Sequence, residues 1–182
     1  MTELTTIALF IQFVALPFYL YSFLIDKKQL LLVQLFTTII FACGYFIMSA
    51  WVGVIISLSL LPAIFLMRDF DYNNYEAHWP SLLFIGILMI NVVGVILLYQ
   101  DVFSLVVVIG GSSYCYAIIF YEENSTKFKS IALFAHTLFV VYEIIVTTYV
   151  FAIIDSLTSI SLIMFILMQS KKRTDNERNH MQ

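Results

Sequence analysis

The chain of 182 residues is 62% hydrophobic and only 12% charged, and its formal net charge is −3. A soluble domain is about 45–50% apolar and about 25% charged, so lipid must solvate much of this chain. The small net charge argues against a nucleic-acid partner. Cys43 and Cys115 lie in apolar runs, where a disulfide is not expected, and two lone thiols match no metal-ligand spacing. No cofactor is expected.

The apolar segments predict seven membrane-spanning helices. About 20 helical residues cross a hydrocarbon core about 30 Å thick. After a first span at about 4–25, the stretch between Lys27-Lys28 and Arg68 carries no formal charge. It is long enough to cross the membrane twice, with a turn near Ser49-Ala50-Trp51. The remaining spans are expected at about 80–99, 102–121, 130–148 and 150–169.

The nine Lys and Arg residues predict the orientation of the chain. With seven spans, all of them fall in the connections after spans one, three and five or in the carboxyl-terminal tail. The other three connections contain none. Because basic residues favour the cytoplasmic side, we expect the amino terminus outside and the carboxyl terminus in the cytoplasm.

The second half of the chain repeats the first. A shift of 98 residues places Leu35-Phe36 over Leu133-Phe134 and Ile55-Ile56 over Ile153-Ile154. The predicted fold is therefore an all-α polytopic membrane protein with a 3+1+3 parallel repeat, in which a linker helix restores the orientation of the second triplet. The expected units are a first triple-helix repeat at 1–68, a cytoplasmic loop and linker helix at 69–100, a second triple-helix repeat at 101–169 and a cytoplasmic tail at 170–182.

One segment carries a family likeness. From Lys27-Lys28-Gln29-Leu30 through Tyr45-Phe46 to Gly53 the chain resembles the YgjV-type bacterial inner-membrane proteins, and Tyr142 and Asp155 fit the second repeat of that family. The resemblance covers most of the chain. It implies a relationship to the SWEET and PQ-loop transporters and to the PnuC vitamin carriers. It therefore implies a SWEET-like fold in the bacterial cytoplasmic membrane, with substrate bound between the repeats near the midplane.

The chain also departs from the pattern of that family. The pattern has His where this chain has Gly44, and a PQ dipeptide where Phe18 follows Pro17. It has Asn at the positions of Ser57 and Glu143, and Arg near Ala63. These differences prevent a transfer of substrate identity from the family.

Three ionisable residues lie inside predicted spans. An ionisable group costs about 2.5–3.5 kcal/mol at the centre of a membrane helix, so its presence favours a functional role. Glu143 and Asp155 lie six residues before and after Tyr149, which predicts equal depth below the outer turn. If they share one cavity, their like charges favour one shared proton. With their repeat counterparts, the predicted substrate-binding residues are Thr38, Tyr45, Ser57, His136, Glu143 and Asp155.

Each ionisable candidate also has a purely structural interpretation. Asp155 could cap the outer end of span seven, Glu143 could be solvated in a wide outer mouth, and His136 could be hydrogen bonded between helices. The seventeen Phe and eleven Tyr are expected mostly to pack or to face lipid. The amides expected to hydrogen bond between helices are Gln12, Gln34 and Asn91.

The expected function is a membrane transporter or facilitator that moves a small polar metabolite by alternating access between the repeats. The alternative is a non-transporting accessory, sensing or immunity protein on the same scaffold. Enzymatic activity is not expected, because the chain lacks the His-Glu-x-x-His, Gly-x-Ser-x-Gly and phosphate-binding glycine motifs. The expected partners are the lipid bilayer and an unidentified small polar solute, and a homo-oligomer is left open.

Overall fold

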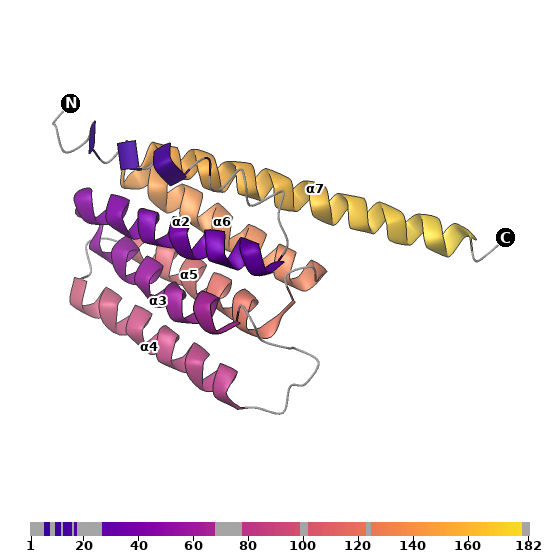
Figure 1. The fold of residues 1–182 in the computed structure, drawn as a ribbon, viewed down its shortest axis with the longest axis horizontal. Helices are drawn as coiled ribbons and strands as arrows, with labels where there is room; N and C mark the ends of the chain where they lie inside the picture. The colour runs from indigo at the N-terminus through magenta and orange to yellow at the C-terminus, as the bar shows by residue number, and fades with distance from the viewer. Residues whose placement is uncertain are drawn as a thin grey trace.

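A computed structural model of the chain describes residues 6–7, 10–11, 13–15, 17, 27–67, 78–98, 102–122 and 125–179. Within this part of the chain, every regular element is a helix (Figure 1). The helices described from end to end are α2 (Lys27–Ile47), α3 (Trp51–Met67), α4 (Trp79–Leu98), α5 (Phe103–Phe120), α6 (Thr126–Ile145) and α7 (Tyr149–Asn179).

The helix boundaries follow local chemistry. Helix α4 begins at Trp79 with Pro80 in its first turn, where the missing N–H of proline costs nothing. Helix α6 begins one turn before the predicted start at 130. The reason is a cap, because the Ser125 side chain accepts a hydrogen bond from the backbone N–H of Phe128 at 3.1 Å. The first predicted span, 4–25, falls largely outside the described residues.

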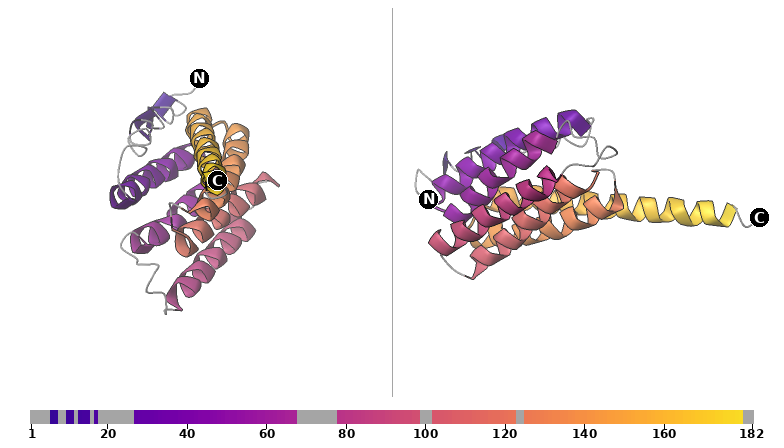
Figure 2. Two further views of the ribbon diagram at one scale, coloured as in Figure 1. Left: turned by 90° about the vertical axis from the view of Figure 1, so that its right-hand side faces the viewer. Right: turned by 90° about the horizontal axis from the view of Figure 1, so that it is seen from below.

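The helices form one bundle with α4 at one edge (Figures 1 and 2). Helix α3 packs against α2, α4 and α5, while α6 packs against both α5 and α7. Helix α4 buries only a narrow stripe that includes Ile87, Asn91 and Val95, whose spacing matches one helix face. Its opposite face exposes Leu82 and Leu97, at 67% and 74%.

The exposed surface is apolar along most of the bundle. Helices α4 to α7 are each long and apolar enough to cross a membrane, whereas α3 and the apolar part of α2, Leu32–Ile47, are shorter. Exposed Phe65, Ile96 and Met168 belong to a surface far too apolar for water. The all-helical, membrane-embedded class is thus supported, and the count of seven spans stays a prediction.

The α2–α3 and α6–α7 connections have the same backbone geometry. Ser49 and Thr147 adopt left-handed conformations, with φ of 58° and 62°. In each turn the next residue, Ala50 or Thr148, donates its N–H at 2.9 Å to the carbonyl five residues before it. The two turns lie 98 residues apart, which is the shift that aligns the two sequence halves. The first turn also lies at the predicted position.

Helix α7 is longer than its predicted span. It continues past Gln169 to Asn179 and projects beyond the rest of the bundle (Figures 1 and 2). The added segment contains four basic residues and neither Gly nor Pro, the residues that most strongly end a helix. The predicted tail at 170–182 is therefore helical through Asn179.

Candidate functional site

A cavity of about 70 Å³ lies inside the bundle, lined by α2, α3, α5, α6 and α7. Five of the six predicted site residues line it. They come from four helices in two hairpins that are far apart in the sequence, and the fold brings them together. The five residues are Thr38, Tyr45, Ser57, His136 and Asp155.

The sixth predicted residue, Glu143, lies directly behind the cavity wall. Its side chain is fully buried, and its Oε1 accepts a hydrogen bond of 2.6 Å from the hydroxyl of Tyr45. The interpretation of Glu143 as a solvated residue in a wide outer mouth is therefore wrong. Tyr45 and Glu143 lie 98 residues apart, so corresponding positions of the two hairpins contact each other directly.

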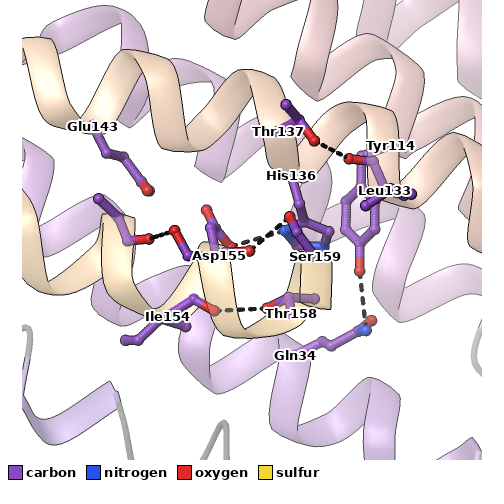
Figure 3. A network of polar contacts seen from close by, with 12 residues as sticks. Gln34, Tyr114, Leu133, His136, Thr137, Glu143, Ile154, Asp155, Thr158 and Ser159 are labelled. Carbon is purple, nitrogen blue, oxygen red and sulfur yellow. Dashed lines mark hydrogen bonds and ion pairs between the residues drawn. The ribbon is translucent and has the colours of Figure 1, made fainter. Parts of the chain in front are cut away.

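His136 and Asp155 form a buried pair across the α6–α7 contact. The His136 Nδ1 lies 2.8 Å from the Asp155 Oδ1, and only 2% of Asp155 is exposed. Figure 3 shows His136 and Glu143 on one helix, with Asp155 of α7 between them. Asp155 lies in the second turn of α7 and pairs with a side chain, so the capping interpretation is wrong. The predicted interhelical bond of His136 is confirmed.

The two carboxyl groups are also close to each other. Glu143 and Asp155 are close enough to interact electrostatically, and each has a second buried oxygen, Oε2 or Oδ2, without a recorded hydrogen-bond partner. A hydrogen bond between two carboxyl groups needs one proton, since two carboxylates offer only acceptors. Burial in a low-dielectric site disfavours two adjacent negative charges. The geometry therefore suits one proton held between the pair.

Another hydrogen-bonded polar pair also lies at the cavity. Gln34 of α2 donates from Nε2 to the hydroxyl of Tyr114 on α5 at 3.0 Å (Figure 3). Both residues line the cavity. The sequence predicted only an interhelical hydrogen bond for Gln34, and that bond is confirmed. It did not place Tyr114 in the site. Nothing in the sequence distinguished Tyr114 from the other ten tyrosines.

Aromatic rings fix the positions of the polar groups. The His136 ring lies between Tyr114 and Phe139, with ring centroids 5.1 and 5.9 Å away. Phe41 stacks on Phe151 with centroids 4.0 Å apart, which joins α2 to α7 beside the cavity. Although most aromatic residues pack or face outward as expected, Phe41 and Phe139 line the site itself.

A separate polar contact lies outside the cavity. The Ser59 hydroxyl donates to the Asn91 Oδ1 at 2.7 Å and joins α3 to α4. Asn91 is fully buried. Its predicted role as an interhelical hydrogen-bonding residue is confirmed, whereas Gln12 lies outside the described residues.

Comparison with known families explains the character of this bundle. The model of the Imp-YgjV family, described as a bacterial inner membrane protein, matches residues 6–173. The chain belongs to the Imp-YgjV family. The predicted family resemblance is confirmed, and Imp-YgjV membership identifies the chain as a protein of the bacterial inner membrane. No curated protein and no solved structure matches it.

Four of the departures from the expected family pattern lie at residues that the structure describes. Ser57 lines the cavity and Glu143 lies behind its wall, at positions where the pattern has Asn. Gly44 and Ala63 are buried within α2 and α3. Two of the departures from the expected pattern, at Ser57 and Glu143, thus fall at the site.

Proposed function

We propose that this Imp-YgjV protein is a carrier for a small polar solute in the bacterial inner membrane. The observation that carries the proposal is the cavity itself, in which an acidic residue with an unpaired oxygen faces a space inside an apolar bundle. Buried ionisable groups are costly in membranes and mark solute or ion pathways. The proposal assigns the cavity to solute binding and gives no residue a catalytic step.

The carrier would work by alternating access between two triple-helix repeats. Three features support a parallel 3+1+3 repeat: the matching turns, the sequence shift of 98 residues, and the contact between Tyr45 and Glu143. Helix α4 packs at the edge as expected of a linker helix. Rocking of the 1–68 unit against the 101–169 unit would expose the cavity to each side in turn. The amino terminus would be outside and the carboxyl terminus cytoplasmic.

A ligand screen tests this function. The purified protein in lipid nanodiscs is heated with sugars, nucleosides, vitamins or amino acids. A solute that binds only the folded protein stabilises it by about 2.7 kcal/mol at a hundred times its Kd. We expect one chemical class to raise the Tm. If no solute of any class shifts the Tm, the chain functions as a non-transporting membrane protein instead.

Two matched variants connect that shift to the cavity. Thr38→Leu places a larger apolar side chain in the cavity wall, whereas Thr137→Leu makes the same change on the exposed face of α6. We expect the first variant to lose the ligand-induced Tm shift and the second to retain it. Equal shifts in both variants would place the binding site elsewhere.

A further inference from the structure

The acidic end of the cavity has a chemistry that narrows the class of solute. We propose that it binds the protonated amine of a solute, in competition with a proton shared by Glu143 and Asp155. This inference rests on the carrier function proposed above. It concerns the class of solute that binds and the proton that is released on binding.

Unpaired buried oxygens provide the first argument. Asp155 Oδ2 and Glu143 Oε2 are buried and accept no hydrogen bond from a protein donor. Asp155 is 2% exposed and is one of the residues that line the cavity. A buried acceptor without a donor is unfavourable, and more so when it is charged. Without a solute the shared proton satisfies the pair, and an ammonium group from outside the protein can take its place as the donor.

The charge balance provides the second argument. Among the described residues that line the cavity there is no Lys or Arg. The lining instead carries the Asp155 carboxyl group, which lies beside His136. A cationic solute can therefore replace the shared proton without a change in the charge of the cavity. The titratable groups that face the pair are Tyr45 from α2, Tyr114 from α5, His136 and Tyr142 from α6, with none from the lining of α3.

The aromatic residues that line the cavity favour a cationic solute over a neutral hydrogen-bond donor. Phe41, Tyr45, Tyr114 and Phe139 line the same space as the acid. Ring faces attract a cation within about 6 Å, and quaternary and protonated amines are recognised by such walls. An anionic solute would be repelled by Asp155. The combination of a buried carboxylate with aromatic rings therefore favours an ammonium group, and the cavity volume suits a small amine or the head of a larger one.

Binding would release a proton. When the ammonium group donates a hydrogen bond to the Asp155 carboxylate, one cation faces the two neighbouring carboxylates. Its positive charge then takes over the role of the shared proton in reducing their repulsion. The shared proton leaves to water, so one positive charge enters as another departs and the charge of the cavity is unchanged. Proton and amine thus compete for the same pair, and amine binding strengthens as the pH rises.

The test uses ethanolamine and its neutral counterpart ethylene glycol, with calorimetry on the full chain in nanodiscs. We expect ethanolamine to bind and ethylene glycol not to bind. The Kd for ethanolamine should increase about tenfold for each unit by which the pH falls, as long as the pair holds its shared proton. In weakly buffered solution, a pH indicator should report about one proton released per amine bound. This release is measured on the unaltered protein and so requires no variant to fold.

Three variants assign the effect to residues. Asp155→Asn should weaken ethanolamine binding at least about tenfold, because a neutral amide replaces the charged acceptor. Glu143→Gln should retain binding but lose the proton release. Glu122→Gln, on an exposed loop residue, should behave as the unaltered protein.

Two outcomes would overturn the inference. One is equal binding of ethanolamine and ethylene glycol, and the other is absence of binding by ethanolamine, methylamine and choline at saturating concentrations. A neutral solute that raises the Tm in the screen would then leave the carrier function standing without the amine. Failure of every solute class would remove both.

Discussion

Among the described residues, one recorded hydrogen bond reaches the Glu143 side chain, and the Tyr45 hydroxyl donates it. Glu143 is fully buried, so this single bond of 2.6 Å accounts for much of its accommodation in the bundle. The close approach depends on Gly53, since a Cβ atom there would lie 2.8 Å from the Tyr45 ring. One glycine thus allows a tyrosine to reach an acid on the other hairpin.

Removal of that hydroxyl should destabilise the protein. Tyr45→Phe leaves a buried acceptor without its donor, at a cost of about 1–3 kcal/mol in the free energy of unfolding. Tyr149→Phe is the matched control, because Tyr149 is 55% exposed at the start of α7. Unfolding in detergent micelles measures both. Equal stability of the two variants would contradict the assigned bond.

The candidate residues illustrate what the sequence could predict at this scale. Asp155, Glu143 and His136 were identifiable because ionisable groups are rare in apolar spans. Their mutual contacts could not be predicted, because the rotation of each helix about its axis determines which side chains face the neighbouring helices. Tyr114 was missed for a related reason, since a tyrosine in a chain with eleven of them gives no signal until packing places its hydroxyl beside Gln34.

At the scale of elements, glycines set how closely the helices approach. A Cβ atom on Gly111 of α5 would overlap the Ile56 side chain of α3. The same atom on Gly86 of α4 would meet nothing within 4 Å. The α3–α5 contact, which forms one wall of the cavity, therefore requires the absence of a side chain at 111.

Substitution of these two glycines should separate packing from helix propensity. Gly111→Ala should lower the free energy of unfolding by about 1–3 kcal/mol through overpacking. Gly86→Ala should be neutral or stabilising by up to about 1 kcal/mol, because alanine favours the helix. Adding Ile56→Ala to Gly111→Ala should cost less than the sum of the two single changes. Strict additivity in this cycle would show that the two residues do not meet.

The helices themselves were largely predictable. Uncharged runs bounded by basic residues, a proline in a first turn and the turn near Ser49 placed α2 to α7 within a few residues. Two boundaries were not. The Ser125 cap depends on a local backbone bond, and the extension of α7 depends on the absence of any terminating residue after Gln169.

At the scale of the whole molecule, charge predicts the topology. A reporter fused after Arg173 should be active only if it functions in the cytoplasm, because the basic residues favour that side. Reporters fused near Ser49 or Gln100 should be active only outside. A cytoplasmic signal at Gln100 would contradict both the seven-span arrangement and the parallel repeat.

The central claim is that the cavity around Asp155 carries a solute across the membrane. The most direct measurement is uptake of the solute found by the screen into proteoliposomes with equal amounts of folded protein. The unaltered chain and Glu122→Gln should show the same saturable uptake. Uptake by Asp155→Asn should be at least about tenfold lower, since the variant lacks the carboxyl group that lines the cavity. Uptake by Asp155→Asn equal to that of the unaltered chain would contradict the account.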